Sequence, residues 1–455
     1  MTHNYSKYIH VQVTVAIGAI SLILSGNPSM AAFPPANPRA ELFHNGGTGN
    51  CEGCHLSHGS EDDPRASRQS TVSERNTERL RGSDPGSTCL RCHEGPTSGL
   101  PKEHYVSTSA SGITEGTPPA QLTPGGDFAW LKKSYNWSPE EGRGGSRESS
   151  PGERHGHNII AVDFNYFRDG IKGAAPGGSY PSNSLSCISC HDPHGNFRRN
   201  ADGSVTSSGL PVGSSGSYKS SPVPDATQSV GTFRMLAGKG YQLKGFSSAP
   251  PFLNDPPAAV APDSYNRKES GADTRVAYGS GMSEWCQNCH AAVHGNGYGG
   301  GTQHPAGNNA RFSSEVTGNY NAYVASGNLN GNSGNSYSSL VPYEMGTDDY
   351  EVLRKTANSD GSEISGPGRG GGNPNVMCLS CHRAHASGWD SMTRWNMNAD
   401  FLVVNGRYPG VDNGASSWTA QGRTSAEIQK TFYDRPVNQF ASYQRSLCNK
   451  CHAKD

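Results

Sequence analysis

The scarcest side chains in this 455-residue sequence are those that usually build a hydrophobic core. Leu, Ile, Val and Phe together make up about 15% of the residues, a level typical of disordered chains. Disorder of that kind normally comes with a large net charge, yet 38 Lys and Arg residues nearly balance 39 Asp and Glu residues. The composition therefore excludes both a conventional large core and a simple disordered polyelectrolyte.

Two further absences narrow the possible functions. The chain has no excess of basic residues, which excludes the usual electrostatic basis of nucleic-acid binding. After residue 24 it has no apolar run long enough to cross a bilayer. We therefore expect neither a nucleic-acid partner nor a membrane span in the mature protein.

Cysteine is absent except in one repeated pattern. All 12 cysteines fall in six Cys-x-x-Cys-His motifs, the attachment signature of c-type haem. In each motif the two thiols form thioether bonds to the porphyrin, and the histidine is the proximal iron ligand. The predicted haem-binding cysteines are Cys51 and Cys54, Cys89 and Cys92, Cys187 and Cys190, Cys286 and Cys289, Cys378 and Cys381, and Cys448 and Cys451. The predicted proximal ligands are His55, His93, His191, His290, His382 and His452.

Zinc and disulfide interpretations explain the motifs less well. Structural zinc needs four ligands per ion, usually two cysteine pairs or one pair with two histidines at regular spacing. Here each pair has its own adjacent histidine, and the motifs start 38 to 99 residues apart. A disulfide framework is compatible with the even count, but it gives no reason for a histidine after every second cysteine.

Six haem groups also account for the unusual composition. Porphyrins are large and apolar, so the chain can wrap them instead of burying its own side chains. With 58 Gly and 30 Pro residues, we predict mostly irregular coil with short helices and very little sheet, wrapped around a closely stacked haem chain. The motifs should each occupy one helical turn. A helix is expected at 424–433, strands at 158–167 and 401–404, and a loop at 204–227.

The first 31 residues are typical of a secretory signal peptide. Lys7 supplies the positive charge, residues 11–24 form a 14-residue apolar region, and Ser29-Met30-Ala31 offers small residues for cleavage. Residues 32–455 are then a single hexahaem unit. Export agrees with the motifs, because covalent haem attachment takes place outside the bacterial cytoplasm.

The second axial ligand of each iron decides what a haem protein can do. Nine histidines remain outside the motifs and the signal peptide: His44, His58, His104, His155, His157, His194, His294, His304 and His385. His58, His194 and His385 follow a proximal histidine by three residues, and His294 follows one by four. Because the two axial ligands of one iron lie on opposite faces of the porphyrin, we expect these histidines to bind a neighbouring haem.

Several longer strings resemble the filament-forming hexahaem c-type cytochromes on the outer surface of metal-reducing bacteria. The resemblance covers most of the mature chain and lies in 123–128 (TPGGDF), 156–159 (GHNI), 190–195 (CHDPHG), 274–278 (TRVAY), 281–285 (GMSEW), 378–388 (CLSCHRAHASG), 443–445 (YQR) and 448–455 (CNKCHAKD).

The resemblance implies that every haem has two histidine ligands, and that His58 binds the fifth haem of a neighbouring identical protomer. The other family ligands would fall on His104, His157, His194, His294, His304 and His385. These are six candidates for five haems, so at least one is not a ligand. His44 and His155 are weaker candidates.

Three functions remain open. The first is electron transfer along a bis-histidine haem chain polymerised into an extracellular filament, with redox partner cytochromes as donors and metal oxides, electrodes or partner cells as acceptors. The second is a soluble periplasmic shuttle with the same chemistry. The third is a multihaem reductase with an open haem, which six intact motifs and surplus histidines disfavour. In the first two the protein is not an enzyme.

We expect the haem-free chain not to fold, because its own apolar side chains are too few to offset the loss of conformational entropy. Circular dichroism of the apoprotein should show no cooperative unfolding transition. A native-like cooperative transition without haem would contradict this expectation.

Overall fold

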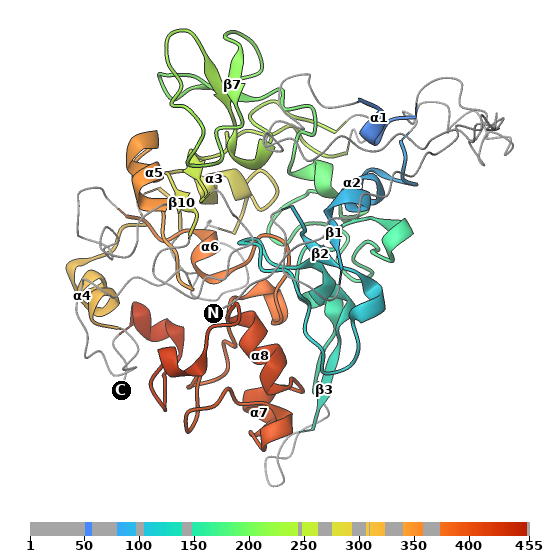
Figure 1. The fold of residues 1–455 in the computed structure, drawn as a ribbon, viewed down its shortest axis with the longest axis vertical. Coiled ribbons are helices and arrows are strands. Elements are labelled where there is room, and N and C mark those ends of the chain that lie inside the picture. Colours follow the sequence, from blue (N-terminus) through green and yellow to red (C-terminus); the bar gives the residue numbers. More distant parts are fainter. Residues whose placement is uncertain are drawn as a thin grey trace, which may run out of the picture. The chain divides into compact units, whose positions relative to one another are not determined.

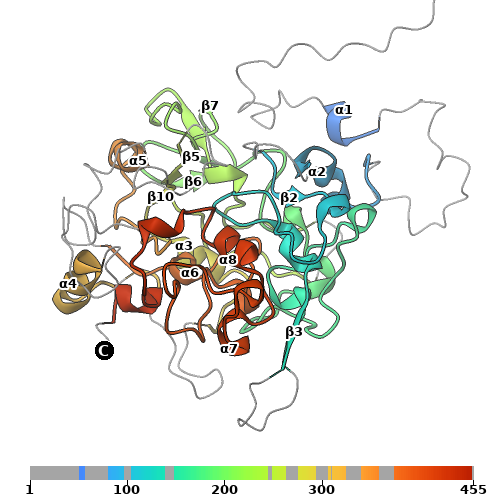
Figure 2. The same cartoon turned by 60° about the horizontal axis from the view of Figure 1, so that its bottom comes forward.

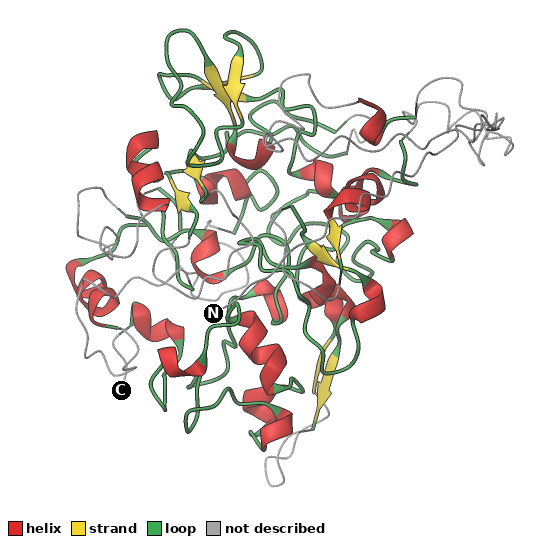
Figure 3. Cartoon of the chain, in the orientation of Figure 1, coloured by secondary structure: helices red, strands yellow, loops and turns green. Residues whose placement is uncertain are grey.

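The computed structural model describes residues 51–56, 80–96, 104–138, 148–243, 248–262, 275–293, 306–308, 310–323, 340–357 and 374–452. Its contacts divide the chain into two units, Met1–Ala40 and Glu41–Asp455, and every described residue belongs to the second. Irregular chain predominates, and the helices and strands are short (Figure 3). The predicted mostly-coil class is confirmed.

The α-helices among these residues are all nine residues long or shorter. They are α1 Cys51–Cys54, α2 Pro85–His93, α3 Met282–Cys286, α4 Ser314–Ala322, α5 Tyr350–Ala357, α6 Cys378–Cys381, α7 Ser417–Ala420 and α8 Ser425–Thr431. The predicted helix at 424–433 is confirmed as α8. Thr424 is its N-cap, and the Glu427 side chain accepts a hydrogen bond from the Thr424 backbone N–H at 2.9 Å. This reciprocal capping box starts the helix at that residue. The α7 helix lies below α8 in both Figure 1 and Figure 2.

Single turns of 3-10 helix connect many of these segments. They are η3 Ala110–Gly112, η4 Phe128–Lys132, η5 Gly152–Arg154, η6 Val162–Phe164, η7 Ser182–Ser184, η8 Cys187–Ser189, η9 Phe233–Met235, η10 Asp390–Met392, η11 Val411–Asn413, η12 Val437–Gln439 and η13 Leu447–Lys450.

Strands occur only as short pieces. They are β1 Glu94–Gly95, β2 Ser107–Thr108, β3 Tyr135–Trp137, β4 Glu148–Ser150, β5 Arg198–Arg199, β6 Val205–Thr206, β7 Val212–Ser214, β8 Ser229–Gly231, β9 Ala259–Val260 and β10 Ala277–Tyr278. The largest described sheet has the order β6-β5-β8-β7, and β1 pairs with β2 in parallel. The predicted loop at 204–227 is wrong in part, because β6 and β7 lie within it.

Both predicted strands are wrong. Within 158–167 the chain turns through η6 and returns, so that Ala161 bridges to Tyr166. The N–H of Val162 there donates to the Asp84 carboxylate at 2.9 Å, a side-chain partner that replaces a neighbouring strand. Within 401–404 the chain makes only isolated bridges before the left-handed turn at Asn405.

The buried apolar side chains form several separate clusters instead of one core. A large cluster includes Trp389, Trp395 and Phe432, and the partly buried Cys381 and Cys451 pack against it. Other clusters border Cys187, Cys286 and Cys289 in the same way. Each of these clusters therefore ends at the cysteines of a motif, as expected of a chain folded around cofactors.

Buried charges join the C-terminal segment to the segment around residue 135. Lys133 and Glu427 form an ion pair with side chains that are 6% and 1% exposed. The Tyr135 hydroxyl donates to Glu427 at 3.0 Å, and Lys133 also donates to the Thr117 carbonyl at 2.8 Å. Close by, the fully buried Arg423 guanidinium lies over the rings of Tyr135 and Trp389.

Every helix in the described part of the chain is too short or too polar to cross a lipid bilayer.

Removing one partner of the Lys133–Glu427 pair should destabilise the protein strongly, because the other charge stays buried without compensation. We expect Lys133→Met to lower the free energy of unfolding by about 3–5 kcal/mol. Combining it with Glu427→Gln should restore much of this loss, since Gln keeps the oxygen that caps α8. Denaturant unfolding of the haem-loaded protein measures both effects.

Lys430→Met is the matched control, because Lys430 lies on the same helix as Glu427 and pairs at 2.7 Å with Asp434, which follows the helix, closer to solvent. Its loss should cost less than about 1 kcal/mol. A Lys133→Met variant no less stable than this control would contradict the prediction.

Candidate haem sites and their histidine pairs

The predicted single helical turns are found at four motifs, in α1, η8, α6 and η13. At the second motif the helix α2 is nine residues long and ends at His93, and at the fourth the helix α3 ends at Cys286, the first cysteine of the motif. Polar side chains start several of these turns. The Asp84 carboxylate accepts from the Ser87 N–H at 2.7 Å at the start of α2, and Ser446 caps η13. Within the third to sixth motifs, the N–H of the histidine donates to the carbonyl of the first cysteine at 3.0–3.1 Å. This bond brings that cysteine and the histidine to one side of the turn.

Backbone carbonyls orient four of the motif histidines. The Nδ1 atom of His93 lies 2.6 Å from the His104 carbonyl, and that of His191 lies 2.7 Å from the Arg234 carbonyl. The Nδ1 atom of His290 lies 2.8 Å from the Pro176 carbonyl, and that of His382 lies 2.8 Å from the Ser391 carbonyl. Because a carbonyl only accepts, Nδ1 must carry the proton. The lone pair is then on Nε2, which is the tautomer that an iron ligand requires.

Three pairs of imidazole rings lie opposite each other at nearly the same separation. Ring centroids are 6.3 Å apart for His55 and His194, 6.2 Å for His93 and His104, and 6.1 Å for His157 and His290. Two metal–nitrogen bonds of about 2 Å, with each nitrogen about 1 Å from its ring centre, give a separation of about 6 Å. Each pair thus has the spacing of two imidazoles on opposite sides of one iron.

His385 and His157 both approach motifs other than the one nearest in sequence. Burial, and after it a positive charge on the nearby His191, lower the pKa of His385 to about 3. Burial likewise lowers the pKa of His157 to about 4, with His290 as the next cause. Both imidazoles are therefore neutral at physiological pH, as metal ligation requires.

The string TPGGDF at 123–128 packs closely against His385. A Cβ atom on Gly125 would lie 2.9 Å from the His385 ring, and one on Gly126 would overlap the Ala386 carbonyl at 1.8 Å. Gly126 also has a φ of +94°, and the Phe128 ring stacks on His385 with centroids 4.5 Å apart. Glycine is required here because backbone and imidazole approach so closely.

His155 is fully buried away from the motif histidines. Its Nδ1 donates to the Trp130 carbonyl at 3.0 Å, and its Nε2 lies 2.8 Å from the Ser150 hydroxyl. With both nitrogens committed to protein partners, His155 belongs to the buried polar network around Arg423. The candidate ligands His44, His58, His294 and His304 lie outside the described residues.

Neighbouring motifs lie close together in chain order. The Cys89 side chain is in hydrogen-bond contact with Cys187, and that of Cys286 with Cys378. Cys190 lies within electrostatic range of Cys289, and Cys381 within range of Cys451. The second to sixth motifs therefore form a continuous row, and His194, which follows the third motif, faces His55 of the first.

These features fit haem c. The described cysteines form no disulfides, and no three Cys, His, Asp or Glu side chains gather as a zinc site would require in the part of the chain that the structure describes. The paired thiols would hold the porphyrin, and the opposed imidazoles would hold its iron. Sequence reasoning missed the carbonyls of Pro176, Arg234 and Ser391, because a backbone acceptor carries no residue-type signature.

Comparison with known proteins agrees with this chemistry. No family model matches the chain. It is 45% identical over 450 residues to C-type cytochrome OmcS of Geobacter sulfurreducens, covering 98% of this chain and 99% of the relative. Two solved structures, of OmcS nanowires and of an outer membrane cytochrome S filament from the same organism, match with a TM-score of 0.79 and 46% identity. Each match covers 91% of this chain and 100% of the chain in the solved structure.

Proposed function

This chain belongs to the OmcS family of c-type cytochromes, and we propose that it carries electrons along a row of six covalently bound haems as one protomer of an extracellular filament. The observation that carries this proposal is the row of contacting motifs with imidazole pairs about 6 Å apart. When bound, haem supplies an iron that takes up or releases one electron. The chain's own residues hold, orient and shield the sites.

We assign the axial ligands from the ring pairs. His55 pairs with His194, His93 with His104, and His290 with His157. We further assign His385 to His191, because His191 is the motif histidine whose charge lowers the pKa of His385 most. In these four sites one ligand comes from the motif and the other from elsewhere in the chain. Filling both axial positions with imidazole leaves no position for a substrate, so electron transfer to extracellular acceptors is outer-sphere and the protein is not an enzyme.

The fifth and sixth sites take ligands from outside the described residues. His58 would bind the iron held at His382 in a neighbouring protomer, as the family resemblance implies. His294 or His304 would complete the site at His452, which leaves one of these two without an iron. The solved relatives are a nanowire and a filament, and this supports polymerisation through the fifth site. Export past the outer membrane would place the filament on the cell surface. There it would exchange electrons with metal oxides, electrodes, partner cells and other cytochromes.

Replacing a proposed distal ligand should open one haem. We expect His157→Gln to convert one of six haems from low spin to high spin, because the amide is a poor iron ligand. Electron paramagnetic resonance of the ferric protein measures this change. His155→Gln is the matched control two residues away, and all six of its haems should remain low spin. A high-spin signal in the control, or none in His157→Gln, would refute the assignment.

Removing the proposed inter-protomer ligand should block assembly without damaging the other sites. We expect His58→Ala to give soluble protomers with five low-spin haems and one open haem. Cryo-electron microscopy of material sheared from the cell surface would show filaments for the unmodified protein only. Filaments of His58→Ala with an unbroken haem row would contradict the role of His58. Protomers of the unmodified protein that never polymerise would instead favour a soluble shuttle.

A further inference from the structure

Two strained turns of the same kind lie against two of the motif histidines. Consecutive non-glycine residues with positive φ occur at Arg234 and Met235 (50° and 56°) and at Ser391 and Met392 (57° and 48°). We call η9 (Phe233–Met235) the first clip and η10 (Asp390–Met392) the second clip. Residues with a Cβ atom disfavour this left-handed region. Strain of this kind persists only where the surrounding structure enforces it.

The two clips make the same hydrogen bonds to their motifs. The carbonyl of the middle residue accepts from Nδ1 of His191 in the first clip and of His382 in the second, at 2.7 and 2.8 Å. The methionine carbonyl accepts from the backbone N–H of the residue after the histidine, Asp192 or Arg383, at 2.8 Å in both. Two residues further on, Ala237 and Arg394 donate to the second cysteine of the motif. The same bonds arise from two segments that are distant in the sequence, and in both a left-handed turn directs a carbonyl at the motif histidine.

Side chains that do not touch a motif hold the second clip in place. The Asp390 carboxylate accepts a hydrogen bond from the Ser150 hydroxyl, lies 3.4 Å from Arg154 Nη1 and lies 3.6 Å from His155 Nε2. The buried Arg423 donates to the same Ser150 hydroxyl at 2.8 Å. Asp390 therefore ties the clip to the rigid network that joins distant parts of the chain.

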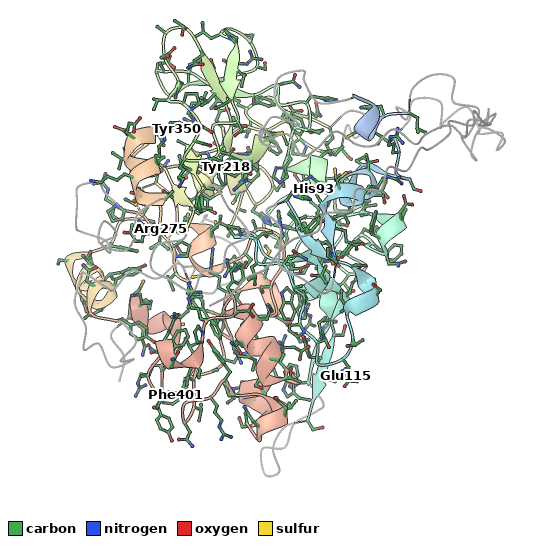
Figure 4. All side chains as sticks on the ribbon, viewed as in Figure 1. His93, Glu115, Tyr218, Arg275, Tyr350 and Phe401 are labelled. Atoms are coloured by element: carbon green, nitrogen blue, oxygen red, sulfur yellow. The ribbon has the colours of Figure 1, made fainter. Side chains whose placement is uncertain are left out.

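The first clip is held by different groups. The Arg234 N–H donates to the Ser217 hydroxyl at 2.7 Å, and its guanidinium lies 4.3 Å from the ring centre of Tyr218, labelled in Figure 4. Because the anchors differ, a change at Asp390 alters one clip and leaves the other as an internal reference.

We propose that Asp390 is a positioning residue for the iron ligand His382. Through the second clip it fixes the Ser391 carbonyl against Nδ1, which makes the imidazole a stronger donor to ferric iron and keeps the reduction potential of the fifth haem low. The inference rests on the proposed haem ligation. The reduction potential of the fifth haem, the site proposed to join protomers, would then depend on residues remote from the motif.

Substitutions at Asp390 test the anchor. We expect Asp390→Ala to raise the reduction potential of one of the six haems. A redox titration in which the signal of each haem is resolved measures this change. A change of the order of tenfold in the reduction equilibrium of that haem is expected for a lost outer-shell hydrogen bond, which is about 59 mV for one electron. Asp390→Asn removes the charge but keeps an acceptor for Ser150, so its shift should be much smaller. Equal shifts in the two variants would assign the effect to charge and overturn the proposal.

Substitutions at Ser391 test the clip without changing Asp390. Ser391→Gly tolerates the left-handed backbone and should leave the potential unchanged, whereas Ser391→Val disfavours it and should raise the potential of the same haem. Asp412→Ala is the control for Asp390→Ala, because Asp412 also lies in a three-residue 3-10 turn and its carboxylate accepts from the Ser425 N–H at 2.6 Å, but this turn has no left-handed residue. It should leave all six potentials unchanged.

The outcomes separate this inference from the function on which it rests. If the haem ligation is wrong, the unmodified protein will lack six low-spin haems. If only the positioning role is wrong, six low-spin haems will be present and Ser391→Val will match Ser391→Gly.

Discussion

In the proposed haem arrangement each iron needs two imidazoles on opposite faces of a porphyrin, and the rest of the structure depends on this need. A motif supplies one imidazole, and the local turn cannot supply the other, so a second segment must cross to the far face. His157 reaches His290 from a position 133 residues earlier in the chain. His194 reaches His55 in the same manner. Such crossings connect remote segments site by site, and they explain why an irregular chain adopts one arrangement.

The packing around the sites follows from the same constraint. The chain buries its apolar side chains in small clusters that end at motif cysteines such as Cys187 and Cys286. Between the clusters, buried polar groups connect distant segments of the chain, as a larger hydrophobic core would otherwise do. Lys133 and Glu427 attach α8 to the segment before β3, and Arg423 spans Gly388, Gln421 and Ser150 through its three nitrogens. Such a network stabilises a fold only while its members are all satisfied, which favours a single arrangement over several.

Sequence reasoning succeeded where the signal was local. The turns that carry the motifs and the cap of α8 at Thr424 depend on residues within a few positions of one another. It failed where distant partners decided the backbone. Val162 looked like part of a strand, but its N–H is satisfied by Asp84, and the chain turns instead. The clips at Arg234 and Ser391 were equally invisible, since nothing in their residue types announces a left-handed turn or a carbonyl aimed at a histidine.

The sequence by itself determined the class of fold and the type of cofactor, and it predicts the attachment points, because thioether chemistry requires a fixed local spacing and a scarcity of apolar residues limits the core. It also supplied more histidines than the irons need. Only the tertiary structure decided among the described ones. His155 and His157 lie two residues apart, yet Trp130 and Ser150 occupy both nitrogens of the first, while the second faces His290 across the width of an iron site. The reason is physical: a ligand is defined by what lies opposite its ring, and that is set by segments far away in the chain.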